Sequence, residues 1–308
     1  MNCMSKFKEF AEYVEVKTKI TGVFSFLTAL VWLIYSGKTI DTARSLVFFA
    51  GIILFDLTAT AINNYTDSNR ADREPALGRS AALAVILILF ALSAAAGLWL
   101  VILTDTAVLL LGGLCFLFGV LYSYGPVPIS HGPLGEVTSG FFYGLLIPFI
   151  LVYINTPGEL LTWSLTLSRI SVEINVLPML KLLLLSAVPF CLTANIMLAN
   201  NICDVSGDIE VGRHTLAFYL KNKALPAFAA VYYLAYLSVV VMVAAGFLSP
   251  LSLLLLFTII PVQKNIGVFF KKQVKEETFI IAIKNFLIII IPHIVLILLG
   301  GLLPGGGL

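Results

Sequence analysis

The sequence predicts an all-α polytopic membrane protein with about nine transmembrane helices. Of its 308 residues, 59% are apolar and only 12% are charged, and the mean hydropathy is +1.01. A soluble domain carries about 25% charged residues. The composition therefore excludes a soluble globule, a disordered chain and a nucleic-acid-binding protein with a basic face, and it makes the lipid bilayer the expected partner.

Nine apolar runs supply the predicted spans. Most approach the roughly 20 residues that a membrane helix needs, and they do not alternate as the strands of a β-barrel do. The eighth run is the weakest, because Pro261, Gln263 and Lys264 interrupt it. The runs are residues 20–36, 44–62, 80–104, 107–124, 134–154, 179–201, 226–247, 250–270 and 279–299.

We expect these spans to form one domain over residues 1–308, preceded by an interfacial segment at residues 1–19. In that segment, apolar residues from Phe7 to Val14 recur with the spacing of a helix face. The four cysteines form no C-x-x-C pair and the three histidines lie far apart. The sequence therefore suggests neither a disulfide framework nor a Cys/His metal site.

The basic residues give the chain an orientation. With nine spans, 14 of the 19 basic residues fall on one side and three on the other; without the eighth span four lysines change sides and the split is 10 to 7. The positive-inside rule favours nine spans in the cell membrane, with the side that carries the 14 basic residues facing the cytoplasm. Those residues are Lys6, Lys8, Lys17, Lys19, Arg70, Arg73, Arg79, Arg213, Lys221, Lys223, Lys264, Lys271, Lys272 and Lys275.

Two loops on that side carry the same polar motif, Asn-Asn-x-x-Asp. The first copy spans 63–67 and the second 200–204, and a further aspartate follows each, Asp72 and Asp208. Asn63 and Asp67 share one helix face, and the helix is expected to unwind before Asp72. If the second helix continues past the membrane boundary, its Asn200, Asp204 and Asp208 share a face in the same way.

Carboxylates and amides in this pattern point to a hard cation. Aspartates four residues apart repel each other, and a divalent ion compensates for that repulsion. Mg²⁺ prefers oxygen ligands and completes its shell with water and substrate phosphates. Two such motifs facing each other can hold a diphosphate, although acids in a loop are often only solvated. The arginines that could contact phosphate oxygens are Arg70, Arg73, Arg79 and Arg213.

A diphosphate beside a lipid-facing cavity suggests a prenyl donor. Ionisation of its allylic C–O bond leaves a cation that must be shielded from water and that aromatic faces stabilise. Tyr122, Tyr124, Phe142 and Tyr143 are candidates, with packing as the alternative for each. Asp56 lies inside the second run; an acid there has a site role or a hydrogen bond to a neighbouring helix.

From about residue 15 to 300, the chain resembles the UbiA family of intramembrane prenyltransferases. The family motif N-D-x-x-D-x-x-x-D matches at Asn63 and Asp67 and, one residue displaced, at Asp72; D-x-x-x-D matches at Asp204 and Asp208. The resemblance implies nine helices around a central cavity under cytoplasmic cap loops. It also implies Mg²⁺-dependent transfer of a polyprenyl group from a diphosphate to an aromatic acceptor.

The motif around Asn200, the stretch 212–217 and the Tyr-Ser-Tyr-Gly-Pro stretch at 122–126 look like the branch that prenylates 1,4-dihydroxy-2-naphthoate in menaquinone synthesis (MenA-type). Two residues depart from the pattern. Asn64 stands where the family often has Asp, and Cys203 stands where this branch commonly has Arg. The acceptor could therefore be another phenol or a lipid.

The resemblance assigns roles residue by residue. Asn63, Asp67, Asp204 and Asp208 would be catalytic ligands of Mg²⁺ and diphosphate, with Asp72 as a further metal ligand and Asn200 in support. Ligand contacts would come from Arg70, Arg73, Arg213, Lys17, Lys19, Tyr122 and Tyr124; the lysines could instead snorkel to the membrane interface. Glu136 would face the acceptor or the cap loop, or else stabilise its own helix terminus.

Two other classes of protein remain as alternatives. A cation-coupled transporter also shows repeats and intramembrane acids, but its sites lie near the membrane midplane; of the acids here only Asp56 fits that pattern. A non-catalytic scaffold that binds a quinone or lipid would keep the cavity without needing both acidic motifs.

Overall fold

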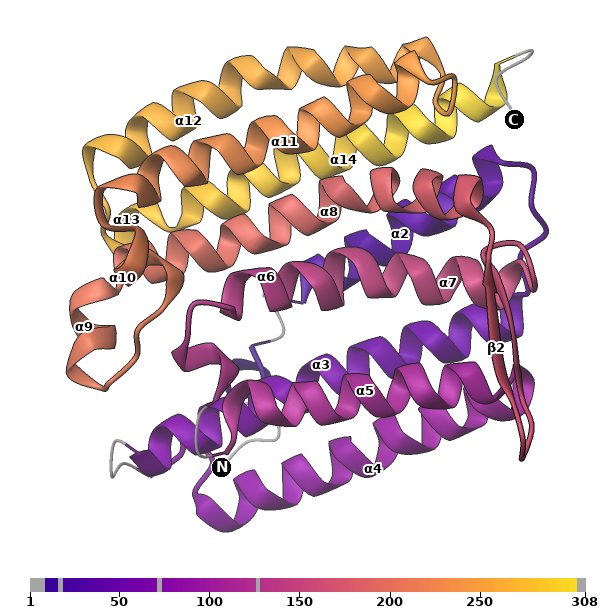
Figure 1. Cartoon of the computed structure of the whole chain (residues 1–308). Helices are drawn as coiled ribbons and strands as arrows, with labels where there is room; N and C mark the ends of the chain where they lie inside the picture. Colours follow the sequence, from indigo (N-terminus) through magenta and orange to yellow (C-terminus); the bar gives the residue numbers. More distant parts are fainter. Residues whose placement is uncertain (1–8, 16–18, 71–73, 126–127, 304–308) are drawn as a thin grey trace. The chain divides into compact units, whose positions relative to one another are not determined.

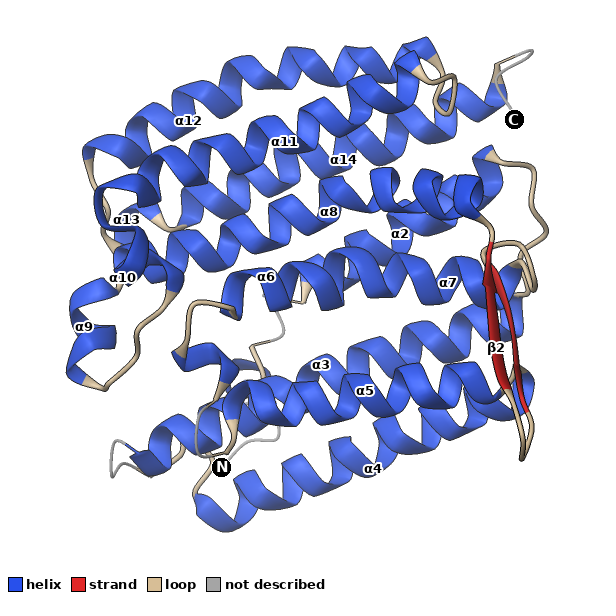
Figure 2. Ribbon diagram, in the orientation of Figure 1, coloured by secondary structure: helices blue, strands red, loops and turns tan. Residues whose placement is uncertain are grey.

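The computed structural model describes residues 9–15, 19–70, 74–125 and 128–303. In that part of the chain, eight helices are long and apolar enough to cross a membrane, and a ninth apolar helix, α2 (Ile20–Tyr35), is shorter. The nearly all-helical membrane fold expected from composition is confirmed, and each of the nine apolar runs corresponds to a helical segment (Figure 2).

The chain divides into two compact units, which are described separately. The first comprises residues 1–23 and 42–129, and the second 24–41 and 130–308. The prediction of one domain over 1–308 stays a prediction.

The first unit is built on three long helices that lie side by side (Figure 1). One of its contacts is aromatic: Phe55 lies 4.6 Å from Phe116, ring centre to ring centre, and fits over Gly119, where a Cβ would come within 2.3 Å of it. Asp105 caps the third helix by accepting hydrogen bonds from two backbone N–H groups. The helices are α3 (Thr42–Arg70), α4 (Arg79–Leu103) and α5 (Thr106–Ser123).

The second unit carries the remaining spans. One of them, residues 135–155, changes from α-helix to a π-helical segment and back, a feature frequent at functional sites. Its elements are η2 (Ile129–His131), α6 (Gly135–Ser139), η3 (Gly140–Leu146), α7 (Ile147–Asn155), β1 (Leu161–Leu165), β2 (Ile170–Ile174), α8 (Val176–Cys203), α9 (Val205–Glu210), α10 (Leu216–Leu220), η4 (Lys221–Lys223), α11 (Ala224–Ala244), η5 (Pro250–Thr258), α12 (Ile259–Lys271), α13 (Lys275–Thr278) and α14 (Ile280–Leu302).

The span at 135–155 packs tightly against α8. A Cβ on Gly144 would lie 2.2 Å from the backbone of Phe190, so only glycine permits this approach. Pro189, inside α8, lies at the same contact. This packing fixes the start of the span, which carries Glu136, relative to α8, whose end carries the second acidic motif.

The antiparallel hairpin of β1 and β2 was not expected from the sequence. Leu161 pairs with Ile174 and Leu165 with Ile170. Both strands are short and mostly exposed, so they lack the buried alternating face that would have identified them.

Candidate active site

The first motif lies on α3, which continues to Arg70 and therefore carries Asn63 and Asp67 on one helical face. The side-chain amide of Asn63 donates to Asp67 Oδ2 at 3.4 Å, while its Oδ1 accepts a hydrogen bond from the Ser123 hydroxyl at 2.9 Å. The residues predicted from the motif are thus brought together. Ser123, which lies between the two predicted tyrosines, was not predicted; its position in the Tyr-Ser-Tyr stretch was the signal available.

Asp56 and Thr60 lie on α3 about two turns and one turn before Asn63, where they meet Lys19. The Lys19 Nζ is 3.0 Å from Asp56 Oδ1, and both side chains are less than 10% exposed. The same ammonium also donates to Thr60 Oγ1 and to the Asp56 carbonyl. Its three donors therefore have partners within the protein, and the predicted contact of Lys19 with a ligand stays a prediction. The intramembrane acid has a cation beside it, in agreement with the cost of burying a lone charge.

Asn64, the departure from the family pattern, has a structural role. Its Nδ2 donates to the backbone carbonyl of Tyr13 at 2.7 Å, and the Tyr13 hydroxyl donates to the carbonyl of Ala61 at 2.9 Å. Burial, followed by the neighbouring Tyr65, raises the pKa of Tyr13 to about 12, so the hydroxyl remains a donor at physiological pH. An aspartate at position 64 could not donate the first bond.

For the other predicted residues of this unit, the structure gives either no description or only the exposure of the side chain. Lys17, Asp72 and Arg73 fall outside the described residues, and the side chain of Arg70 is not described. Tyr122 is half-buried, whereas Tyr124 is 63% exposed.

The second motif does not lie on one continuous helix, so the condition for Asn200, Asp204 and Asp208 to share a face is not met. Helix α8 ends at Cys203, and Asp204, with φ −118° and ψ 12°, separates it from the short α9. The Asp204 carboxylate is drawn to Lys275, whose Nζ lies 2.9 Å from Oδ2. Asn200 and Asp208 therefore lie on two different helices joined at Asp204.

Asp208 is buried on α9 and has a basic neighbour. Its Oδ1 is 3.9 Å from Arg213 Nη1, and the Arg213 Nε donates to His131 Nε2 at 3.2 Å. Backbone hydrogen bonds close the same turn, from the Arg213 N–H to the Asp208 carbonyl and from the His214 N–H to the His131 carbonyl. Asp208 and Arg213, which were predicted separately as a metal ligand and a phosphate contact, thus lie side by side, and the structure adds His131 from the segment before α6.

Glu136 meets this motif from the start of α6. It is 2% exposed, and its Oε1 accepts a hydrogen bond of 2.8 Å from Asn201 Nδ2. The Asn201 Oδ1 in turn faces the amide of Asn200 at 3.4 Å. The second Asn of the repeated motif is therefore held by a buried acid 65 positions earlier, a partner that no local pattern indicates.

The family model for the UbiA prenyltransferase family matches residues 23–286, most of the chain and both acidic motifs.

The chain belongs to the UbiA prenyltransferase family. Membership confirms the resemblance drawn from the motifs, and with it the class of enzyme, a prenyltransferase.

Individual relatives agree with the family. A 1,4-dihydroxy-2-naphthoate octaprenyltransferase of Bacillus subtilis (strain 168) is 33% identical over 142 residues, which are 46% of this chain and 40% of that protein. A UbiA homologue from Aeropyrum pernix K1 has a TM-score of 0.64 at 22% identity, over 89% of this chain and 97% of that one. A UbiA homologue from Archaeoglobus fulgidus bound to GPP and Mg²⁺ has a TM-score of 0.60 at 11% identity, over 94% and 99%. At these identities the solved structures support the fold.

The donor set of this UbiA-family chain suits Mg²⁺. Within the described ranges, no three His, Cys, Asp or Glu side chains gather into a preformed metal cage. Mg²⁺ usually binds one or two carboxylates and takes its other ligands from water and phosphate. Asp204 and Asp208 beside the amides of 200–201, and Asp67 beside Asn63, are oxygen donors of that number and kind.

Proposed function

We propose that this protein transfers a polyprenyl group from a prenyl diphosphate to an aromatic acceptor in a Mg²⁺-dependent reaction. We further propose that the acceptor is 1,4-dihydroxy-2-naphthoate, for menaquinone biosynthesis. The observation that carries the proposal is the pair of Asn-Asn-x-x-Asp motifs at helix ends in a chain of the UbiA family. The Bacillus subtilis relative supports this acceptor over other phenols or lipids.

Asn63, Asp67 and Asp72 form one ligand group in this proposal, and Asn200, Asp204 and Asp208 form the other. Mg²⁺, when bound, neutralises the negative charge that develops on the departing diphosphate. Arg70, Arg73 and Arg213 contact phosphate oxygens, and Lys17 supports them. Arg213 lies beside the second ligand group, because its Nε donates to His131 Nε2 and its Nη1 is 3.9 Å from Asp208 Oδ1.

The remaining residues orient the ligands and protect the cation. Ser123 and Glu136 hold the amides of Asn63 and Asn201, so that each amide keeps one orientation. Tyr122, half-buried beside Ser123, offers a ring face to the allylic cation, with Tyr124 at the more exposed edge. The acceptor ring attacks the cation and then loses a proton or a carboxyl group.

The basic residues support an orientation in the cell membrane with both motifs in the cytoplasm. A transporter is the less favoured alternative. Its best candidate residue, Asp56, is engaged by Lys19 in a buried ion pair.

The test is a reconstituted reaction. The purified protein is mixed with a prenyl diphosphate, Mg²⁺ and candidate naphthoates and phenols, and prenylated product and diphosphate are measured by mass spectrometry. We expect Asp67→Asn and Asp204→Asn each to lower turnover by at least about 100-fold while the protein stays folded. Glu210→Gln, an exposed acid on α9, is the matched control and keeps full activity. Product from both variants at the wild-type rate would refute the assigned site.

A further inference from the structure

A pocket lies at the other end of α8 from the acidic motif, within the second unit. Its volume is about 230 Å³. Lys181, in its wall, is 22 positions before Cys203 at the end of α8, which at 1.5 Å per residue is about 33 Å along the helix. That distance matches the roughly 30 Å of the hydrocarbon core, so the pocket lies at the opposite membrane surface from Asp204.

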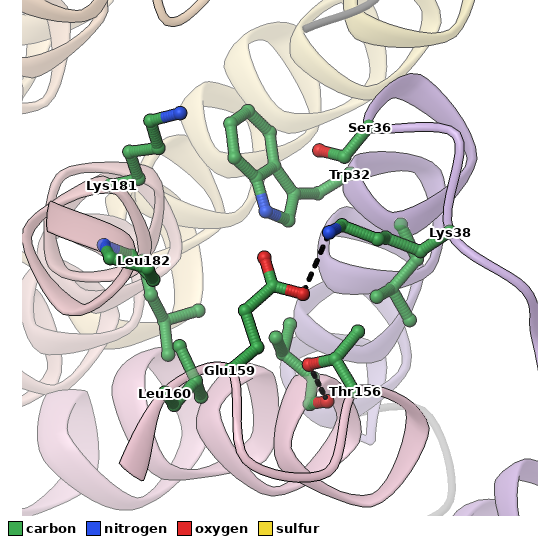
Figure 3. Close-up of a pocket in the computed structure, with 11 residues that line it drawn as sticks. Trp32, Ser36, Lys38, Thr156, Glu159, Leu160, Lys181 and Leu182 are labelled. Atoms are coloured by element: carbon green, nitrogen blue, oxygen red, sulfur yellow. Dashed lines mark hydrogen bonds and ion pairs between the residues drawn. The ribbon is translucent and has the colours of Figure 1, made fainter. Parts of the chain in front are cut away.

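The pocket is formed where three segments of the unit meet (Figure 3). Helix α2 ends in a turn at Gly37, whose φ is +63°, and the turn brings Ser36 and Lys38 to the rim. The turn after α7 supplies Glu159, and the second turn of α8 supplies Lys181. All three segments are helix turns or short turns at helix ends, so the backbone that carries the polar side chains is ordered rather than part of a long loop.

The pocket is lined by more positive than negative side chains, and it contains a hydroxyl donor for which the described residues offer no acceptor. Lys38 Nζ is 2.7 Å from Glu159 Oε2, so these two charges balance. Lys181 is left over: its Nζ lies 5.1 Å from the centre of the Phe247 ring, and it forms no ion pair with any carboxylate in the described part of the chain. The Ser36 hydroxyl is buried without a hydrogen-bond partner among the described residues. A bound anion would provide a counterion for Lys181 and a hydrogen-bond acceptor for Ser36.

The location and size indicate which anion. Ligand pockets for whole small molecules usually measure about 300–1,000 Å³, so this one suits a headgroup rather than a quinone. Trp32 lines it, and tryptophan is enriched at the level of lipid headgroups. We propose that this pocket binds the phosphodiester of an anionic phospholipid, with Lys181 as the charged contact and Ser36 as a hydrogen-bond donor.

Native mass spectrometry tests the proposal on the full chain. The protein is reconstituted in bilayers of phosphatidylcholine with about 20% phosphatidylglycerol, extracted gently, and its retained lipids are counted. We expect enriched phosphatidylglycerol on the wild type and a loss on the order of tenfold in Lys181→Gln, because one charge-assisted contact is removed. Lys284→Gln, which removes an exposed lysine within α14, is the matched control and keeps the enrichment.

Two more variants make the test independent of folding. Lys181→Arg should retain the lipid, and Glu159→Gln should increase retention, because it releases Lys38 from its ion pair. Equal retention by wild type and Lys181→Gln, equal retention of phosphatidylcholine, or lower retention in Glu159→Gln would each overturn the proposal.

A parallel measurement separates a lipid from a soluble anion. Delipidated protein is titrated with inorganic phosphate while its thermal unfolding is followed. Stabilisation that depends on Lys181, without phosphatidylglycerol retention, assigns the anion site to a soluble phosphate and overturns the lipid assignment. Retention of phosphatidylglycerol without such stabilisation supports the lipid.

Discussion

The ion pair of Lys19 and Asp56 gives the sharpest prediction about stability. We consider Lys19→Met, which keeps the length of the side chain and removes its charge. The Nζ and Oδ1 atoms are 3.0 Å apart and both side chains are less than 10% exposed. Two unit charges at that distance attract by roughly 5.5 kcal/mol at an effective dielectric constant of about 20. The cost of taking them out of water offsets part of this attraction in the wild type.

In the variant, Asp56 keeps its desolvation cost and loses the ammonium of Lys19. Removing one partner of a buried pair typically costs about 3–5 kcal/mol, and we expect Lys19→Met to lower the free energy of unfolding by that amount. Asp56→Asn should also destabilise, because it leaves a buried ammonium. The double variant buries no charge at this position, so its loss should be smaller than the sum of the single losses by at least about 2 kcal/mol.

The assay is equilibrium unfolding of the four proteins in the same detergent, followed by circular dichroism and tryptophan fluorescence. Strictly additive losses would show that the two charges do not interact and would refute the reasoning. A double variant as stable as the wild type, with prenyl transfer retained, would show that the pair makes no net contribution to stability or to turnover.

Two further substitutions test packing and anchoring. Gly144→Ala should lower the free energy of unfolding by about 1–3 kcal/mol or more, because its Cβ would lie 2.2 Å from the Phe190 backbone. The control is Gly267→Ala on α12, where a Cβ would meet nothing within 4 Å, and it should be neutral or stabilising by up to about 1 kcal/mol. Both variants are compared with the wild type by their unfolding midpoints in detergent. Asn64→Asp should cost about 1–3 kcal/mol and speed hydrogen exchange around Tyr13, since the donor to its carbonyl is lost. Unchanged exchange together with tighter Mg²⁺ binding would instead indicate that position 64 belongs to the metal site.

The sequence by itself determined the class of the protein, the nine apolar segments and the family. Length and apolarity suffice for the class and the segments, because a bilayer accepts only segments that satisfy their own backbone hydrogen bonds; the family followed from the two acidic motifs. The repeated motifs likewise singled out Asn63, Asp67, Asp204 and Asp208 as candidate ligands, since carboxylates are conspicuous in a chain with 12% charge; their role stays a prediction. Even the eighth run, weakened by Pro261, is helical, as the charge distribution had required.

Tertiary structure decided which partner each polar group has. Lys19 lies against Asp56, Asn201 against Glu136 and Lys275 against Asp204. These partners are 37, 65 and 71 positions apart, so no helical or strand period relates them. The break of α8 at Asp204 was likewise not indicated by the sequence, because a helical periodicity would continue past that residue. Pairing of polar groups is set by how helices pack, and packing is a property of the folded chain rather than of any local segment.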